Sequence, residues 1–114
     1  MSWIMYLMNN KKYRKIDGDS NIIDKINEMT LDEKIGQMVL SGFDGTDFND
    51  ELNTLINDLK VGGIILFSRN IENSKQLKKL NLDIEEANKN IPLFISIDEE
   101  GGRVNRLSKN IKKI

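Results

Sequence analysis

The sequence predicts an α/β fold in which parallel strands alternate with helices. Three short apolar runs, at residues 37–43, 61–67 and 93–97, have the composition of strands that are buried on both faces. Segments of helical periodicity separate these runs, and this alternation is typical of right-handed βαβ units. We therefore expect residues 21–114 to form three βα units, preceded by short helices, and residues 1–20 to form an N-terminal tail.

Two short helices are predicted ahead of the first strand. The first is indicated by apolar residues that recur at about one helical turn, namely Ile22, Ile23, Ile26 and Met29. The second begins at a capping box formed by Thr30 and Glu33, in which each side chain binds the other residue's backbone N–H group. This second helix is expected to lead directly into the strand at 37–43.

Two further helices are predicted between the strands, each with candidate capping residues. Thr46 or Asp47 can cap the first, and Asn73 or Ser74 can cap the second. Their apolar positions follow the helical period, at Leu52, Leu55, Ile56 and Leu59 in one helix and at Leu77, Leu80, Ile84 and Ala87 in the other. Pro92 ends the second helix, because proline disfavours helical backbone in the residue before it.

Three parallel strands are too few for a complete sheet or barrel. A barrel of this kind needs eight strands, and the outer strands here lack the charges, prolines and bulges that protect a true edge. We therefore expect residues 21–114 to be the N-terminal part of a larger barrel or sheet. Its unpaired apolar edges are expected to promote aggregation or strand exchange unless the missing strands are supplied.

The composition excludes several classes of function. Of the 114 residues, 39% are hydrophobic and 31% are charged, as in an ordinary soluble domain. The 17 basic residues are spread along the chain and the net charge is −1, which argues against a nucleic-acid partner. The one tight basic run, at 11–15, is expected to be a solvated tail rather than a phosphate or membrane contact. Residues 1–8 are too short for a membrane helix, so the cytoplasm is the expected location.

The chain contains neither cysteine nor histidine. It can therefore form no disulfide and no thiolate metal site. It also lacks the commonest metal ligand and the commonest general acid or base. Any catalysis by this chain alone would have to use carboxylate, lysine or tyrosine side chains.

The strongest candidate site follows the third predicted strand. Acidic residues, glycines and arginines gather there, namely Asp98, Glu99, Glu100, Gly101, Gly102, Arg103 and Arg106. The carboxyl ends of parallel strands are where ligands meet α/β folds. Asp44 and Arg69 follow the first two strands and would face the same opening at the carboxyl ends of the strands, the mouth of the candidate site. There they could be ion-paired or solvated loop residues, or ligand contacts. Gly62 and Gly63 precede their strand, which indicates close packing or a turn rather than a phosphate cradle.

Three interpretations of this cluster are open. In the first, Asp98 caps a helical turn, the glycines adopt positive φ, and the arginines pair with Glu99 and Glu100. In the second, carboxylate acceptors and guanidinium donors bind the hydroxyl groups of a sugar or similar polyol. In the third, Asp98 and Glu100 hold Mg²⁺ for phosphoryl chemistry, although the nearby arginines would compete for the carboxylates.

Three motifs, in this order, carry a resemblance to a known family. They are Ile35-Gly-Gln-Met38 with Gly42-Phe-Asp-Gly45, Val61-Gly-Gly-Ile-Ile-Leu-Phe67 with Arg69-Asn70, and Ile97-Asp-Glu-Glu-Gly-Gly-Arg-Val-Asn-Arg106. Together they resemble the N-terminal region of glycoside hydrolase family 3, and more closely its β-N-acetylhexosaminidase branch. The resemblance covers about residues 22–110.

The resemblance implies a (β/α)8 TIM barrel and the removal of terminal β-linked N-acetylglucosamine with retention of configuration. It implies a covalent glycosyl-enzyme intermediate and no metal or organic cofactor. It also implies that Asp98 and Arg106 bind hydroxyl groups of the terminal sugar. Glu100, Gly101, Gly102 and Arg103 match further motif positions, which we assign to the architecture of the loop.

The family's catalytic residues have no counterpart in this chain. The nucleophilic aspartate lies near a late barrel strand, and the branch takes its acid/base from a His-Asp pair, whereas this chain has no histidine. We therefore expect no catalytic residue here, and an N-terminal fragment that contributes part of a sugar subsite and is inactive alone. It would need the missing barrel strands of its parent chain. The alternative is a non-catalytic α/β module that binds a sugar or another partner.

Overall fold

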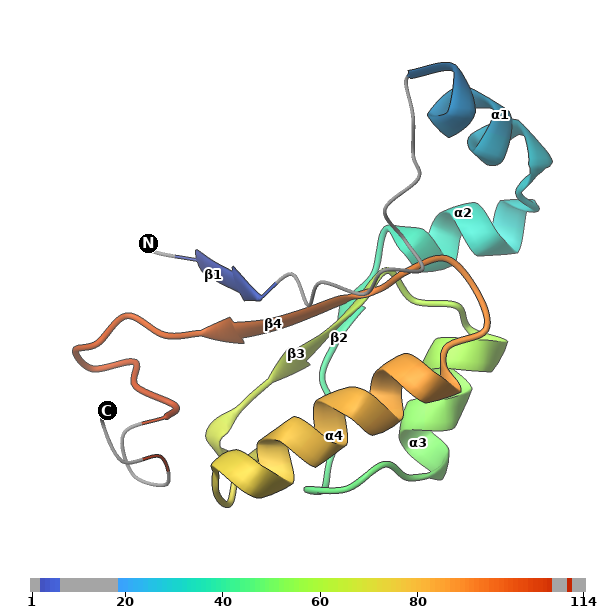
Figure 1. Ribbon diagram of the computed structural model, residues 1–114. Helices are drawn as coiled ribbons and strands as arrows, with labels where there is room; N and C mark the ends of the chain where they lie inside the picture. The colour runs from blue at the N-terminus through green and yellow to red at the C-terminus, as the bar shows by residue number, and fades with distance from the viewer. Residues whose placement is uncertain (1–2, 7–18, 108–110, 112–114) are drawn as a thin grey trace.

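A computed structural model describes residues 3–6, 19–107 and 111 and shows an α/β fold (Figure 1). Its four-stranded sheet has the order β1-β4-β3-β2. The strands are β1 (Trp3–Tyr6), β2 (Leu40–Ser41), β3 (Gly63–Leu66) and β4 (Phe94–Asp98). β2, β3 and β4 are parallel, with β3 in the centre between the other two. The predicted alternation of three parallel strands with helices is confirmed.

β1 lies inside the segment that we expected to be a tail. It runs antiparallel to β4, with Trp3 opposite Asp98 and Tyr6 opposite Ile95. The expectation that both outer parallel strands have an open edge is therefore wrong for β4, whose outer edge β1 covers. Within the described residues, β2 forms one edge of the sheet and β1 the other. The basic run at 11–15 lies outside the described residues.

The first parallel strand is much shorter than the predicted range 37–43. Gln37 is still helical, and the backbone N–H groups of Met38 and Val39 donate to carbonyl groups of the preceding helical turn, at 3.0 Å each. The extended backbone therefore begins only at Leu40. Apolar composition alone could not separate the end of this helix from the start of the strand.

The helices are α1 (Asp19–Glu28), α2 (Leu31–Gln37), α3 (Asp50–Asn53) and α4 (Ser74–Ala87). A π-helical segment, Thr54–Asp58, continues α3, and a 3-10 turn, Ser68–Asn70, follows β3. The predicted capping box of α2 is confirmed, because the Glu33 N–H group donates to Thr30 Oγ1 at 3.2 Å and the Thr30 N–H group donates to Glu33 Oε2 at 2.9 Å. None of the helices in the described part of the chain is long and apolar enough to cross a membrane.

The predicted N-terminal cap is correct for α4 and wrong for α3. Asn73 caps α4, as expected, because its Oδ1 accepts from the Gln76 N–H group at 2.9 Å. The prediction of Thr46 or Asp47 as the cap of α3 is wrong. Asn49 caps that helix instead, since its Oδ1 accepts from the Leu52 N–H group at 3.0 Å. The loop after β2 is therefore longer than its capping pattern suggested.

The hydrophobic core lies between the sheet and the helices α3 and α4, which Figure 1 shows on the same side of the strands. Its buried members are Phe43, Leu52, Ile56, Val61, Ile64, Leu66, Leu80, Ile84 and Ile95. The prediction that the strands are buried on both faces is only partly correct. Phe94 in β4 and Leu40 in β2 remain half-exposed, because the described helices cover mainly one face of the sheet.

Candidate functional site

The loop that follows β4 is organised by Glu99. Its Oε2 accepts hydrogen bonds from the backbone N–H groups of Arg106, at 2.8 Å, and Leu107, at 3.1 Å. Its Oε1 accepts from the N–H group of Gly101 at 3.2 Å. A single carboxylate therefore closes residues 99–107 into a compact loop. This role of Glu99 was not predicted, because it depends on contacts with the backbone of the loop rather than on a side-chain motif.

The glycines and the remaining charged residues of the loop lie at its surface. Gly101 has φ +74°, a conformation that favours glycine over residues with a Cβ. Gly102, Glu100 and Arg103 are exposed, and the Glu100 N–H group donates to the carbonyl of Val104 at 2.9 Å. These positions form the outer turn of the loop, beyond the hydrogen bonds made by Glu99.

The Arg106 guanidinium group lies over the ring of Phe67, with its central carbon 5.4 Å from the ring centroid. Its Nε is buried and has no hydrogen-bond partner among the described residues. Arg106 comes from the loop after β4, whereas Phe67 directly follows β3. The contact therefore joins two neighbouring strands at their carboxyl ends.

Arg69 reaches the same aromatic ring from the 3-10 turn after β3. Its guanidinium carbon lies 4.8 Å from the Phe67 centroid. Its Nε lies 2.8 Å from Asp44 Oδ1 and also donates to the carbonyl of Phe43 at 3.3 Å. The ion-paired interpretation of Asp44 and Arg69 is thus confirmed, and Arg69 lies at the same mouth as Arg106.

The buried side chain of Asn70 connects the two loops that form this mouth. It is fully buried, and its Oδ1 accepts from the Phe67 N–H group at 2.9 Å. Its Nδ2 donates to the carbonyls of Phe43, at 3.1 Å, and Gly45, at 2.8 Å. One amide side chain therefore fixes the loop after β2 against the loop after β3. In the sequence Asn70 was recognised as part of the Arg69-Asn70 motif, and this role was not predicted.

Asp98 is the last residue of β4 and is partly exposed. No hydrogen bond or ion pair joins it to Arg106 within the described part of the chain. No described helix follows Asp98, and no ion pair within the described residues joins Arg103 or Arg106 to Glu99 or Glu100, so these two parts of the first interpretation are wrong. Its third part, a glycine at positive φ, is confirmed at Gly101. No group of three acidic side chains in the described residues is arranged to hold a metal ion.

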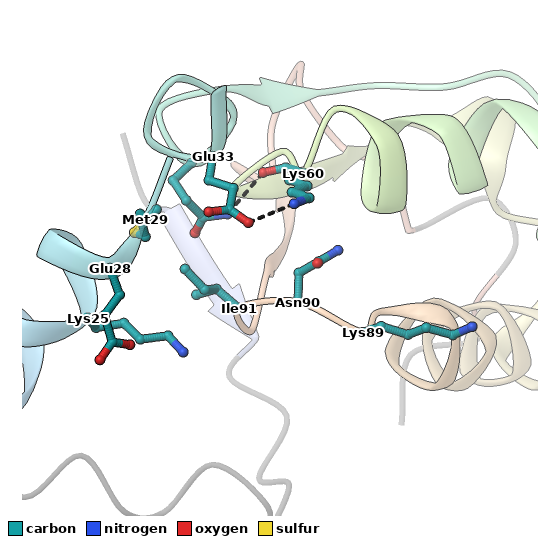
Figure 2. A pocket seen from close by; sticks show the side chains of 9 residues that line it. Lys25, Glu28, Met29, Glu33, Lys60, Lys89, Asn90 and Ile91 are labelled. Carbon is teal, nitrogen blue, oxygen red and sulfur yellow. Dashed lines mark hydrogen bonds and ion pairs between the residues drawn. The ribbon is translucent and has the colours of Figure 1, made fainter. Parts of the chain in front are cut away.

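A separate cavity of about 330 Å³ opens at the amino ends of the parallel strands (Figure 2). It is lined by charged, polar and apolar residues, namely Lys25, Glu28, Met29, Glu33, Gln37, Lys60, Lys89, Asn90 and Ile91. The Lys60 ammonium group donates to Glu33 Oε1 at 2.6 Å. That hydrogen bond, together with one from the Thr30 backbone N–H group, lowers the pKa of Glu33 to about 2.

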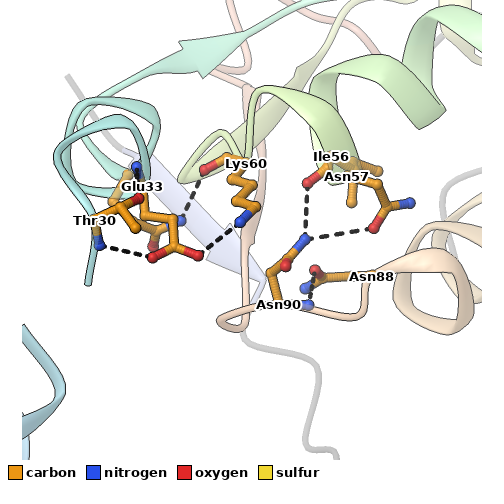
Figure 3. A network of polar contacts seen from close by, with 8 residues as sticks. Thr30, Glu33, Ile56, Asn57, Lys60, Asn88 and Asn90 are labelled. Atoms are coloured by element: carbon orange, nitrogen blue, oxygen red, sulfur yellow. Dashed lines mark hydrogen bonds and ion pairs between the residues drawn. The ribbon is translucent and has the colours of Figure 1, made fainter. Parts of the chain in front are cut away.

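The rim of this cavity is a network of structural contacts. Figure 3 shows Asn90 reaching back to the π-helical segment, where its Nδ2 donates to the Ile56 carbonyl at 3.2 Å. The Asn88 Oδ1 accepts from the Asn90 N–H group at 3.0 Å. This end of a parallel α/β fold usually serves stability, so the carboxyl-end mouth remains the candidate site.

Comparisons with known proteins show the family to which the chain belongs. The sequence pattern of the family described as "Glycosyl hydrolase family 3 N terminal domain" matches residues 30–112. A Beta-hexosaminidase of Alkalilimnicola ehrlichii is 40% identical over 76 residues, which are 67% of this chain and 22% of that protein. A Beta-hexosaminidase of Vibrio cholerae is 39% identical over 70 residues, 61% of this chain and 21% of that protein.

Solved structures give the same result. A glycoside hydrolase family 3 beta-N-acetylglucosaminidase from Paenibacillus sp. matches with a TM-score of 0.67 and 44% identity, over 69% of this chain and 16% of that chain. NagZ from Neisseria gonorrhoeae, solved with N-trifluoroacetyl-D-glucosamine, matches with a TM-score of 0.54 and 38% identity, over 60% of this chain and 20% of that chain. The chain thus spans about a fifth of the length of these relatives. By its motifs, its strand order and these matches, the chain belongs to the N-terminal domain family of glycosyl hydrolase family 3.

Proposed function

We propose that this chain forms part of the subsite that binds the terminal sugar in a β-N-acetylglucosaminidase. The observation that carries the proposal is the state of Arg106. Its guanidinium group is held against Phe67 at the carboxyl ends of the strands, and its buried Nε has no hydrogen-bond partner among the described residues. A guanidinium donor that is held in place without a partner suits a ligand rich in hydrogen-bond acceptors, such as the hydroxyl groups of a sugar. The relation to β-hexosaminidases supports N-acetylglucosamine as that ligand.

Asp98 and Arg106 are proposed to contact the sugar from two sides of this mouth. The Asp98 carboxylate accepts hydrogen bonds from hydroxyl groups, and the Arg106 guanidinium donates them. Hydrogen bonds of this kind strengthen as the sugar approaches an oxocarbenium-like transition state, so they contribute to rate as well as to affinity. Glu100, Gly101, Gly102 and Arg103 are proposed to shape the loop rather than to bind the sugar.

The nucleophile and the acid/base are proposed to lie outside these 114 residues. The chain contains no histidine, and Asp98 is better suited to bind hydroxyl groups than to attack the anomeric carbon. We propose that the remaining barrel strands come from a parent chain and that the chain alone does not cleave glycosides. An assay with an aryl N-acetylglucosaminide tests this, and turnover by the purified chain would contradict it.

Binding can be tested separately from turnover. Titration of the isotope-labelled chain with N-acetylglucosamine should shift the amide signals of residues 98–107. Asp98→Asn and Arg106→Lys should each weaken binding, while Glu100→Gln, at an exposed position of the same loop, should leave it unchanged. Equal binding by all three variants, or shifts confined to the amino-end cavity, would rule out the proposed subsite.

One observation favours the alternative of a non-catalytic binding module. β1 pairs with the outer edge of β4, the edge at which a further parallel strand of a barrel would lie. A sheet whose edge is covered by its own chain is better protected against association. A compact monomer that unfolds in one cooperative transition and binds N-acetylglucosamine would support this alternative over the barrel fragment.

A further inference from the structure

We propose that Phe67 is a positioning residue whose ring sets the orientation of the Arg106 guanidinium group for the terminal sugar. This inference rests on the proposed sugar subsite and adds to it a residue from a different strand. The ring centroid lies 5.4 Å from the guanidinium carbon of Arg106, within the range of a cation–π contact.

The backbone and the side chain of Arg106 are held by different contacts. Its backbone N–H group is fixed by Glu99 at 2.8 Å. Its side-chain Nε has no hydrogen-bond partner and its guanidinium group has no ion pair among the described residues, which leaves the Phe67 ring as the described contact that orients the group. Contact with an aromatic ring does not occupy the donors of the two terminal nitrogens, which, unlike the buried Nε, are proposed to bind hydroxyl groups.

Phe67 is itself fixed by contacts that do not involve the sugar loop. Its backbone N–H group donates to the buried Asn70 side chain at 2.9 Å. A Cβ on Gly42 would lie 3.1 Å from Cε2 of the ring, so the absence of a side chain there leaves room for the ring. The loops after β2 and β3 therefore fix the Phe67 ring independently of the loop after β4.

Arg69 occupies the same ring but cannot take the role of Arg106. Asp44 neutralises its charge at 2.8 Å, and its Nε is also directed at the carbonyl of Phe43. Because Asp44 balances the charge of Arg69, the guanidinium groups of Arg69 and Arg106 can lie against one ring with only one unpaired positive charge between them. Of the two arginines, Arg106 is the one whose guanidinium lacks a described carboxylate partner.

The test uses the side-chain Nε–Hε signal of Arg106 in the isotope-labelled 114-residue chain. In the unmodified chain this signal should be displaced by the ring current, and nuclear Overhauser contacts should connect it to the Phe67 ring. Phe67→Leu should remove the displacement and weaken N-acetylglucosamine binding by about 3-fold to 30-fold. Phe67→Tyr should preserve both. Phe94→Leu, which changes a half-exposed aromatic residue of β4, should affect neither.

The two readouts separate this inference from the proposed function. An unmodified chain with no Overhauser contact between Phe67 and Arg106 would overturn the positioning role, whether or not Phe67→Leu folds. An Arg106 signal that Phe67→Leu leaves in place would overturn it as well. A third outcome is that the unmodified chain binds no N-acetylglucosamine while Phe67→Leu still removes the ring-current displacement. That result would contradict the proposed function and support the role of Phe67 in orienting Arg106.

Discussion

The Lys60 ammonium group donates a hydrogen bond to the Glu33 carboxylate at 2.6 Å and thereby ties α2 to the turn before β3 (Figure 3). The backbone of Lys60 strengthens this connection, because its carbonyl accepts from Gln37 Nε2 at 3.0 Å. Lys60 has φ +53°, so the turn adopts a left-handed conformation at a residue held by two separate contacts with α2. The contacts that hold α2 at the amino end of the parallel sheet therefore include one that depends on the ionisation of Glu33.

The Glu33–Lys60 contact should make stability depend on pH. The pKa of Glu33 is lowered from 4.5 to about 2, chiefly by the hydrogen bond from Lys60 and next by that from the Thr30 N–H group. A lowered folded-state pKa stabilises the fold above about pH 4.5, and this contribution is lost as the pH falls toward 2. The melting temperature of Glu33→Gln should therefore lie below that of the unmodified chain near neutral pH and converge with it in acid.

The matched control for this titration is Asp83→Asn. Asp83 pairs with Lys79 one helical turn away on the surface of α4, at 2.5 Å. Exposed pairs of this kind contribute little, so this variant should follow the unmodified chain at every pH. A difference between Glu33→Gln and the unmodified chain that does not change with pH would show that the contact is not the titrating element.

Gly62→Ala should destabilise the fold by steric overlap. A Cβ at Gly62 would lie 2.2 Å from the backbone carbonyl oxygen of Gln37, and one at Gly63 would lie 2.8 Å from that of Phe94. The expected close packing of this glycine pair is thus confirmed. Overpacking against backbone costs about 1–3 kcal/mol, measurable as a lower midpoint of urea unfolding. Gly102→Ala, whose Cβ would meet nothing within 4 Å, should change the midpoint very little.

Asn70→Ala should cost about 2–4 kcal/mol of unfolding free energy, because buried polar groups lose their partner. Its amide serves one backbone donor, at Phe67, and two carbonyls, at Phe43 and Gly45. Asn70→Asp should be comparably harmful, since a carboxylate cannot donate to either carbonyl. Asn53→Ala removes an exposed asparagine from α3 and provides the control in the same denaturation experiment. Equal stability of the Asn70 and Asn53 variants would contradict the bridging role.

Met38→Lys should reduce self-association of the chain. β2 is an edge strand of the described sheet, and its residue Leu40 is 47% exposed, while Met38 and Val39 directly before it are 87% and 43% exposed. A lysine at an exposed edge discourages strand pairing between molecules. Light scattering should report a smaller mean mass for Met38→Lys, whereas Leu82→Lys, at an exposed position on α4, should behave as the unmodified chain does. Unchanged association of Met38→Lys would indicate that another surface drives it.

Local patterns predicted this chain well where the deciding contacts are close in sequence. The capping box of Thr30 and Glu33 and the cap at Asn73 both act across three residues. The cap of α3 was assigned wrongly although Asn49 also acts across three residues, because several residues able to cap a helix precede α3 and composition does not choose among them. The pairing of β1 with β4 was missed because its two strands lie at opposite ends of the described chain.

The candidate site follows the same rule. Asp98 and Arg106 are proposed as sugar contacts from a contiguous motif and from their place after a predicted strand. Phe67 and Glu99 were not found as supports of Arg106. A ring from another strand and a carboxylate that binds backbone N–H groups leave no spacing pattern in the sequence, because folding alone brings their partners together.

Glu99→Ala should loosen the loop after β4 without unfolding the domain. The carboxylate accepts from three backbone N–H groups, those of Gly101, Arg106 and Leu107. Hydrogen bonds to a charged group contribute about 1.5–3 kcal/mol, so hydrogen exchange at these amides should accelerate by about tenfold or more. The exposed Glu100 offers the matched control, because Glu100→Ala keeps the backbone N–H group through which this residue bonds Val104 and should leave the exchange rates of those three amides unchanged.

Glu99→Gln distinguishes the geometry of the acceptor from its charge. The amide keeps one carbonyl oxygen, which can still accept from the Arg106 and Leu107 N–H groups that share Oε2 at 2.8 Å and 3.1 Å. The N–H group of Gly101 then faces the amide nitrogen and loses its acceptor. Exchange should therefore accelerate most at Gly101 and least at Arg106. Uniform acceleration at all three positions would mean that the charge of Glu99, rather than the placement of its two oxygens, holds the loop closed.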